Sequence, residues 1–205
     1  MAPTLRLADW QTLDGATEIV PPHPIADDVL VALGVRYEPL RFERFADGTL
    51  LVTPPAGTRS SGANAELVRQ VAQWNYERGD GGYVTESSGG VLFADSAVLA
   101  PDATYWSAQS WRGDSHRTFA DVVPDAAFEV LSNSDNLTSA RKKLATYLRN
   151  GVGLAVLIDP KRRRLFVGRA GTSDVVEFPA IQPLDCAPTM PGFVLDLAAI
   201  VALAT

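Results

Sequence analysis

Hydrophobic and polar residues recur with helical and with strand-like spacing in different parts of the chain, which predicts a mixed α/β protein. Apolar residues recur at helical spacing over residues 61–77, and a group of glycines follows them, so we expect a long helix there. Upstream, two strand-like runs flank the turn sequence Ala46-Asp47-Gly48, which predicts a β-hairpin over residues 41–53. A shorter helix is expected over residues 27–33, closed by Gly34.

The second half of the chain alternates short strand-like runs with helical ones. Strands are expected over residues 83–85, 91–93, 98–106, 126–132, 154–158, 165–168 and 174–178. The run 154–158 is apolar throughout, which is typical of a strand buried on both faces. Helices are expected over residues 138–150, ended by Gly151, and over residues 193–203. The order strand, helix, strand around residues 126–158 predicts a right-handed crossover.

The length of 205 residues suits one domain with a sizeable core. Residues 1–25 are polar and rich in proline, so an irregular arm is expected there. No internal repeat, low-complexity segment or linker divides the rest. We therefore expect an N-terminal arm with a short helix over residues 1–35 and a single α/β domain over residues 36–205.

The composition is that of an ordinary soluble globular protein, with 46% hydrophobic and 20% charged residues. A single cysteine, Cys186, excludes an intrachain disulfide or a cysteine-rich zinc site and favours a reducing compartment. The first 14 residues lack the basic start and apolar core of a secretory signal. No apolar run reaches the roughly 18 residues of a membrane helix. A cytoplasmic protein without membrane association is expected.

Two carboxylates lie in unusual positions for this pattern. Asp102 follows a proline at a strand start, and Glu129 lies inside the apolar run 126–132. Because alternate residues of a strand share a face, Glu129 points away from Phe128 and Val130, and a carboxylate in such a strand is costly unless it is paired or bound to metal. The alternative is an edge strand on which Glu129 meets water. Paired carboxylates suit a divalent cation that acts on water beside a phosphate, which predicts a metal-dependent phosphodiesterase, first of all a nuclease.

Two further charged residues are candidates for the same site. Lys143 lies one helical turn before Tyr147, so both share a helix face, and an ammonium group there would stabilise negative charge in a transition state. The alternative for Lys143 is a surface position on an amphipathic helix. Glu43 is a third acid that could belong to the site. Alternatively, it is only a cross-strand ion partner of Arg41 or Arg44.

The formal net charge of −6 argues against a nucleic-acid partner, because binding to phosphates needs lysine and arginine. Two local basic segments offset this objection: Arg141-Lys142-Lys143 with Arg149, and residues 161–164. The alternative is that they form a solvated helix face and a hairpin turn.

Taken together and in order, several short motifs resemble the Uma-two family, a branch of the PD-(D/E)XK nuclease superfamily. The motifs are Phe42-Glu43-Arg44-Phe45-Ala46-Asp47-Gly48, Asn64-Ala65-Glu66-Leu67-Val68, Ser87-Ser88-Gly89-Gly90-Val91, Ala100-Pro101-Asp102-Ala103, Phe128-Glu129-Val130-Leu131-Ser132-Asn133-Ser134, Lys143-Leu144-Ala145-Thr146-Tyr147 with Gly151-Val152, and Leu157-Ile158-Asp159-Pro160. They cover most of the chain, from about residue 36 to residue 200.

The resemblance implies a restriction-endonuclease-like fold, a mixed β-sheet flanked by helices. It implies that Asp102 and Glu129 bind Mg²⁺ or Mn²⁺, that Glu43 lies at or near the same pocket, and that Lys143 is the catalytic lysine. One position departs from the superfamily, whose usual lysine stands two residues after the strand acid, where this chain has Leu131. Either Lys143, on the following helix, has taken over that function, as the resemblance suggests, or catalysis is impaired.

The sequence therefore predicts an Mg²⁺-dependent DNA endonuclease. A homodimer is expected, because cutting both strands of a duplex favours two symmetric active sites. Two alternatives remain open: a nuclease fold kept as a catalytically weak or inactive interaction module, which Leu131 and the acidic charge favour, and a metal-dependent nucleotide phosphohydrolase, which needs no basic track.

Overall fold

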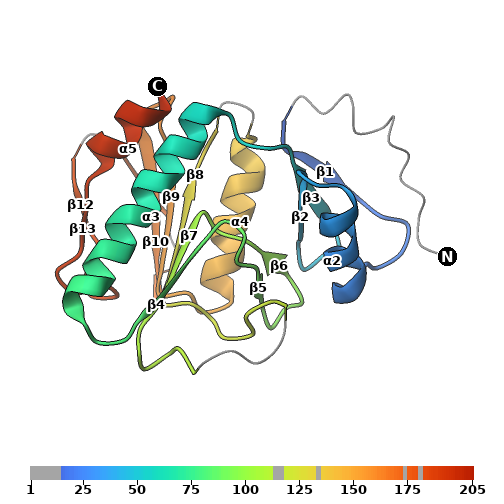
Figure 1. Cartoon of the computed structure of the whole chain (residues 1–205), viewed down its shortest axis with the longest axis horizontal. Coiled ribbons are helices and arrows are strands. Elements are labelled where there is room, and N and C mark those ends of the chain that lie inside the picture. The colour runs from blue at the N-terminus through green and yellow to red at the C-terminus, as the bar shows by residue number, and fades with distance from the viewer. Residues whose placement is uncertain (1–14, 113–117, 133–134, 173–174, 180–181) are drawn as a thin grey trace.

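In its described residues the protein, represented by a computed structural model, contains two large β-sheets that lie side by side, a third sheet of two strands, and four helices that pack around them (Figure 1). The structure describes residues 15–112, 118–132, 135–172, 175–179 and 182–205. The helices are α2 (Asp27–Arg36), α3 (Thr58–Arg78), α4 (Leu137–Arg149) and α5 (Leu197–Ala204). None of the helices in these ranges is both long enough and apolar enough to cross a lipid bilayer.

The larger sheet has six strands in the order β11-β10-β9-β8-β7-β4. Their bounds are β4 (Tyr83–Glu86), β7 (Ala103–Trp106), β8 (Ala126–Val130), β9 (Leu154–Asp159), β10 (Arg164–Arg169) and β11 (Val176–Pro179). Only β8 and β9 run parallel, and α4 connects them, which confirms the predicted strand–helix–strand unit. As parallel neighbours, β8 and β9 end at the same edge of the sheet, at the top of Figure 1.

Helices cover both faces of the larger sheet, which Figure 1 shows nearly edge-on. On one face, α3 and α5 pack on the side chains of Phe128 and Val130. On the other face, α4 packs on Ala127 and Leu157. Every residue of β8 and β9 is therefore buried, as the apolar run 154–158 predicts.

The smaller sheet has five strands in the order β1-β3-β2-β6-β5 and lies beyond α4. Its strands are β1 (Thr17–Ile19), β2 (Arg41–Arg44), β3 (Leu50–Thr53), β5 (Val91–Leu92) and β6 (Val98–Leu99). Strands β2 and β3 form the predicted hairpin, whose turn places Gly48 at a positive φ of 84°. Apolar residues of this sheet and of the larger one meet in a single core under α4, and α2 covers a second small core.

Four details of the predicted elements are wrong. The expected irregular arm contains β1, which pairs with β3, while residues 1–14 lie outside the described part of the chain. Gly34 does not close α2, which continues to Arg36. The expected strand 98–106 is two strands, because Pro101 interrupts it and sends β6 and β7 into different sheets. The expected helix 193–203 begins only at Leu197, since β13 (Val194–Leu195) pairs with β12 (Leu184–Asp185) before it.

The other differences are shifts of one to three residues at element ends. The strand expected over 126–132 ends at Val130, and that expected over 174–178 is observed as β11, with residue 174 outside the described ranges. The long helix predicted over 61–77 is α3, and Gly79 ends it in the left-handed conformation, with φ of 65°.

Candidate functional site

Glu129 lies in the middle of the larger sheet, on the face that α4 covers. Because β8 lies between β7 and β9, the alternative of a water-facing edge strand is wrong. The carboxylate is only 8% exposed, and its Oε1 accepts a hydrogen bond from the hydroxyl of Tyr147 on α4. The strand alternation that sends Phe128 into one core thus sends Glu129 toward α4.

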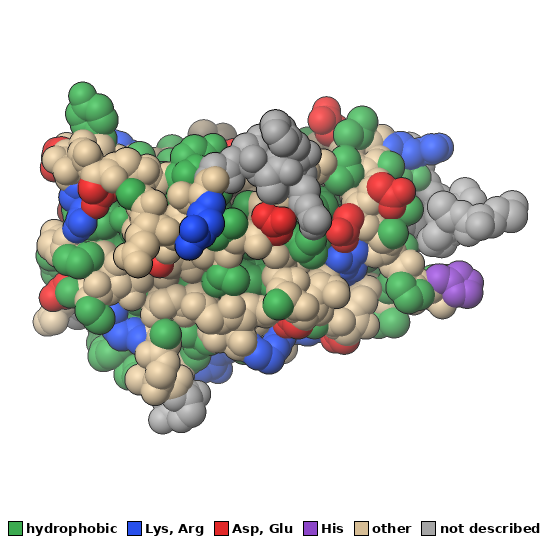
Figure 2. Space-filling view, turned by 90° about the horizontal axis from the view of Figure 1, so that it is seen from below, with side chains coloured by type: hydrophobic (Ala, Val, Ile, Leu, Met, Phe, Trp, Pro, Cys, Tyr) green, Lys and Arg blue, Asp and Glu red, His purple; other side chains and the backbone are tan. Residues whose placement is uncertain are grey.

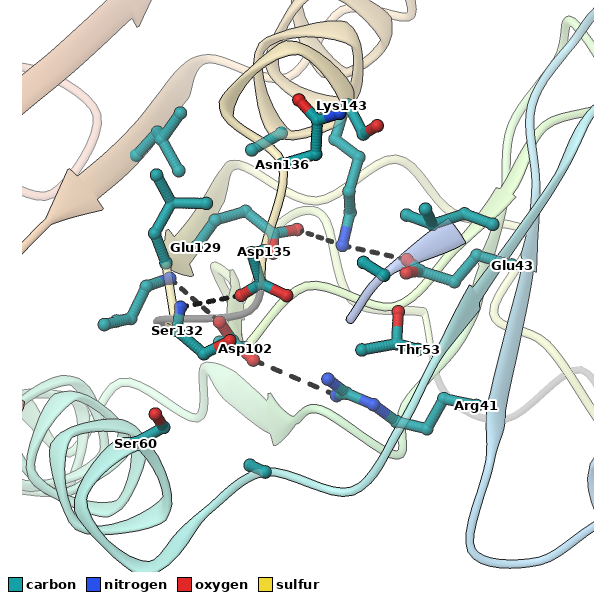
Figure 3. Close-up of a pocket in the computed structure, with 18 of the residues that line it drawn as sticks. Arg41, Glu43, Thr53, Ser60, Asp102, Glu129, Ser132, Asp135, Asn136 and Lys143 are labelled. Atoms are coloured by element: carbon teal, nitrogen blue, oxygen red, sulfur yellow. Dashed lines mark hydrogen bonds and ion pairs between the residues drawn. The ribbon is translucent and has the colours of Figure 1, made fainter. Parts of the chain in front are cut away.

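Lys143 meets Glu129 from the helix above it (Figure 3). Its Nζ lies 2.6 Å from Oε1 of Glu129 and 2.9 Å from Oε1 of Glu43. At 6% exposure, Lys143 is a buried cation, and the alternative of a surface lysine is wrong. The ammonium group therefore links a carboxylate of the larger sheet to a carboxylate of the smaller sheet.

Glu43 reaches this ion pair from β2. Its Oε1 also accepts a hydrogen bond from the backbone N–H of Ala100, at 2.7 Å, and so supports the segment that carries Asp102. The ion partner of Glu43 is Lys143, not Arg41 or Arg44; Arg44 instead pairs with Asp27.

Asp102 lies directly before β7 and is 5% exposed. Its Oδ2 accepts a hydrogen bond from the backbone N–H of Val130, at 2.8 Å, which places Asp102 beside the residue that follows Glu129. Its Oδ1 accepts a hydrogen bond from Nδ2 of Asn64 on α3, at 2.9 Å. The structure thus brings together all four predicted site residues from β2, the start of β7, β8 and α4.

Three residues at this site were not predicted. Arg41 on β2 points into the pocket, with its guanidinium 3.9 Å from Oδ1 of Asp102. Asn64 bonds Asp102, and its own Oδ1 is buried without a hydrogen-bond partner. Asp135 lines the pocket and accepts a hydrogen bond from the backbone N–H of Ser132, at 2.6 Å. Asn64 lies in one of the family motifs, and this position in a motif could have marked it as a site residue.

Burial and mutual repulsion change the proton affinity of these groups. Burial, with the nearby charges of Asp102 and Glu43, raises the pKa of Glu129 to about 8, although Lys143 opposes this. Burial likewise raises the pKa of Asp102. Burial would lower the pKa of Lys143, but Glu129, Glu43 and Asp102 outweigh it and raise that pKa. Lys143 therefore keeps its positive charge, while the pKa of Glu129 lies above its ordinary value.

The pocket between these residues is small and carries excess negative charge. Its volume is about 50 Å³, which is enough for a few water molecules but not for a nucleobase. Among the described residues that line it, four carboxylates (Glu43, Asp102, Glu129 and Asp135) face two cations (Arg41 and Lys143). If all six groups were ionised, their net charge would be −2, which one divalent cation would neutralise.

The oxygen-rich lining fits a divalent cation of the Mg²⁺ type. Across the described parts of the chain, no three Asp, Glu, His or Cys side chains are placed so that they could hold a metal ion by themselves. Mg²⁺ does not require such a set, because it commonly binds through one or two carboxylates and fills its remaining positions with water and substrate phosphate. Asp102 and Glu129 would supply the carboxylates, and the orphaned Oδ1 of Asn64, whose Nδ2 bonds Asp102, would be a further hard oxygen.

The two basic segments behave differently. In the first, Lys142 pairs with Asp47 at 3.0 Å and Arg149 pairs with Asp95 at 3.0 Å, as expected of a solvated helix face. The second forms the exposed turn from β9 to β10. In that turn, Arg162 and Arg164 pair with Asp159 and Glu177, whereas Lys161 and Arg163 form no ion pair with any described residue.

This basic turn follows β9 and therefore lies at the same edge of the sheet as the end of β8. Figure 2 shows the molecule from the opposite end, and there acidic and basic side chains are interspersed with neutral ones. Lys161 and Arg163 thus add positive charge at the sheet edge where β8 and β9 end.

Comparison with protein families matches residues 28–198 of the chain to the family Uma2, described as "Putative restriction endonuclease". The match covers most of the chain and is the family that the sequence motifs resemble. Residues 133 and 134 of one motif lie outside the described part of the structure. A search of curated proteins found no match.

Among solved structures, the chain is similar to a crystal structure of "a putative nuclease belonging to DUF820" from Anabaena variabilis ATCC 29413. The TM-score is 0.68 at 16% identity, over 80% of this chain and 92% of that chain. The similarity confirms the predicted restriction-endonuclease-like fold, a mixed sheet flanked by helices. A cryo-EM structure of a DrdV–DNA complex gives a TM-score of 0.32 at 12% identity, over 58% of this chain and 12% of that chain, a level that supports no argument.

Proposed function

The chain belongs to the Uma2 family of restriction-endonuclease-type proteins, and from this premise we propose that it is an endonuclease that hydrolyses DNA phosphodiester bonds with Mg²⁺ or Mn²⁺. The observation that carries the proposal is the buried ammonium of Lys143, held between Glu129 and Glu43. Burying three carboxylates around one lysine costs desolvation free energy that a purely apolar core would avoid. A catalytic role for these charges would account for that cost.

In this proposal, Asp102 and Glu129 hold the cation, and Glu43 holds Lys143. When bound, the cation would polarise a phosphate oxygen and lower the pKa of a water molecule. Lys143 remains protonated because of its carboxylate neighbours, so it acts as a hydrogen-bond donor that offsets negative charge, not as a base. Tyr147 orients the carboxylate of Glu129 through its hydroxyl group.

The position of Leu131 is consistent with a relocated lysine. Leu131 is 8% exposed and packs in the core under α4, so a lysine there would replace an apolar contact. Lys143 reaches the same carboxylate from α4 and supplies the charge that the superfamily usually carries two residues after the strand acid.

Two features support DNA as the substrate: the family and the basic turn with Lys161 and Arg163 at the same sheet edge as the site. Two active sites would be needed to cut both strands of a duplex, so we propose a homodimer as the working form.

A nicking assay tests the proposal. Supercoiled plasmid and single-stranded DNA are incubated with Mg²⁺ or Mn²⁺ and with wild-type protein or the variants Glu129→Gln and Lys143→Ala. Lys142→Ala is the matched control, because Lys142 is the neighbouring lysine of α4 and pairs outside the site with Asp47. We expect the first two variants to lose cleavage by roughly a hundredfold or more and the control to keep it.

Other outcomes separate the alternatives. Equal cleavage by wild type and variants would indicate a contaminating nuclease and would favour the non-catalytic interaction module. The acidic lining of the pocket favours a nucleotide phosphohydrolase as the second candidate, because a small substrate needs no basic track. Phosphate release from nucleoside triphosphates without DNA cleavage would support that candidate.

A further inference from the structure

Arg41 is placed as a cation that can bind an incoming anion. Its guanidinium points into the pocket from β2, and its nearest carboxylate oxygen, Oδ1 of Asp102, is 3.9 Å away, beyond hydrogen-bond distance. It donates no hydrogen bond to any residue within the described ranges, and its side chain is 37% exposed. The surrounding carboxylates keep it charged: burial opposes the charge, but Asp102, Glu43, Glu129 and Asp135 raise its pKa.

Two larger cavities adjoin the small pocket, and Arg41 lines all three. The first, of about 570 Å³, extends along α3 past Asn64, Val68 and Arg69. The second, of about 470 Å³, extends along β2 and includes the rings of Phe42 and Phe119. Each is within the size range of cavities that hold one small organic ligand.

The charges in the two cavities indicate which part of a ligand they suit. The second cavity contains Glu38 and Glu43 and no basic side chain besides Arg41 among its described residues. In the first cavity, Arg69 is occupied: its guanidinium donates to both carboxylate oxygens of Glu66 and to Gln73. Neither cavity is therefore suited to a phosphate of its own. Apolar side chains line both cavities, and Phe42 and Phe119 add aromatic ones to the second, which suits a base and a sugar.

We propose that Arg41 binds the phosphate that joins two unpaired nucleotides, and that the base and sugar of these nucleotides occupy the two cavities on either side of it. The inference deepens the proposed function, on which it rests, by defining the substrate as an internal linkage of single-stranded or locally unpaired DNA. Bases that enter two separate cavities, both lined by Arg41, cannot be stacked on each other within a duplex. The guanidinium of Arg41 supplies the paired donors that match phosphate oxygens.

Binding in the absence of metal tests the inference independently of cleavage. A fluorescently labelled oligothymidylate of 12 nucleotides is titrated with full-length protein in EDTA, and fluorescence anisotropy is followed at several salt concentrations. The same titration uses a 12-base-pair duplex. The variants are Arg41→Gln, Arg41→Lys and the matched control Arg78→Gln, because Arg78 pairs with Asp80 and lines none of the three cavities.

We expect Arg41→Gln to weaken single-strand binding roughly ten- to hundredfold, as the loss of one charged hydrogen-bonding contact predicts. It should also lower the slope of log K against log salt by about 0.7, the value for one phosphate on a single strand. Arg41→Lys should recover part of the affinity, and Arg78→Gln should stay within about twofold of wild type. Binding of wild type to the single strand should exceed binding to the duplex.

The two proposals can fail separately. Arg41-dependent binding without any cleavage in Mg²⁺ or Mn²⁺ would support the binding inference and overturn the endonuclease. Cleavage by wild type, combined with unchanged binding by Arg41→Gln, would overturn the inference alone. Equal or tighter duplex binding, or no measurable wild-type binding to the oligothymidylate, would also overturn it.

Discussion

Neighbouring residues of β8 meet two different environments. On the α3 face, Phe128 and Val130 pack against apolar residues of α3 and α5. On the α4 face, the residue between them, Glu129, meets Lys143, Tyr147 and, through Lys143, Glu43. One strand of five residues thus belongs half to a core and half to a charged site.

The two faces of β8 are therefore stabilised by different means. The α3 face gains stability in proportion to the apolar surface that it buries. The α4 face at Glu129 depends on balance, since each buried charge is tolerable only while its partner is present. The α3 face should therefore be insensitive to changes in charge state and lose stability when side-chain volume is removed. The charged face should lose stability chiefly when one of its charges is removed.

Removing the cation should have the largest effect. Lys143→Met leaves Glu129 and Glu43 without their ion partner, so we expect the free energy of unfolding to fall by about 3–5 kcal/mol in urea titrations. The triple variant Lys143→Met/Glu43→Gln/Glu129→Gln should regain most of that loss. A single variant within about 1 kcal/mol of wild type would show that the charges are not balanced as described.

Removing volume on the other face should cost about as much or less, without affecting chemistry. Leu67 of α3 is fully buried in the core that contains Phe128, so Leu67→Ala should lower the free energy of unfolding by roughly 2–5 kcal/mol. Because Leu67 does not line the pocket, cleavage per folded molecule should remain close to wild type at low temperature. Loss of cleavage in the folded fraction would contradict the separation of the two faces.

A change of pH should act on the charged face alone. The pKa of Glu129 rises from its ordinary 4.5 to about 8 on folding, so between these values the folded protein holds a proton that the unfolded chain has lost. Stability without metal should therefore fall as pH rises from about 4.5 to 8, by at most about 1.4 kcal/mol per pH unit from this group. Glu129→Gln should flatten the profile, whereas Glu66→Gln, which removes an acid outside the cluster, should leave the slope intact.

A divalent cation should have the smallest effect of the four. At ten times its Kd, Mg²⁺ or Mn²⁺ should stabilise the folded protein by about 1.4 kcal/mol and raise Tm by roughly 3–6 °C in calorimetry. Asp102→Asn should abolish the shift, and Asp80→Asn, at the far end of α3, should preserve it. No shift in wild type at millimolar metal would count against the metal site.

Sequence reasoning predicted the parts of the molecule that are specified by local pattern. Helical spacing predicted α3 and α4, turn chemistry predicted the β2–β3 hairpin, and a continuous apolar run predicted β9 as a buried strand. The motifs also named Glu43, Asp102, Glu129 and Lys143, which the structure brings to one pocket. Their chemical roles and the bound metal stay predictions.

Other parts depend on contacts between distant segments and left no local signal. Strand β1 has three residues and forms only because β3 offers a free edge. Pro101 marks a break in the run 98–106, but the pairing of its two halves in different sheets depends on distant strands. Arg41 and Asn64 resemble ordinary surface residues until the smaller sheet and α3 carry them to Asp102.

The ion pairs of Lys143 span the boundary between the two sheets, because Glu43 belongs to the smaller sheet and Glu129 to the larger one. Fraying of the smaller sheet would withdraw Glu43 and Arg41 together from the residues that the larger sheet and α4 supply. A molecule whose smaller sheet is not assembled would therefore lack two of the charged residues of the site. If the protein cuts DNA, as we propose, only molecules that have finished folding would have a complete cleavage site.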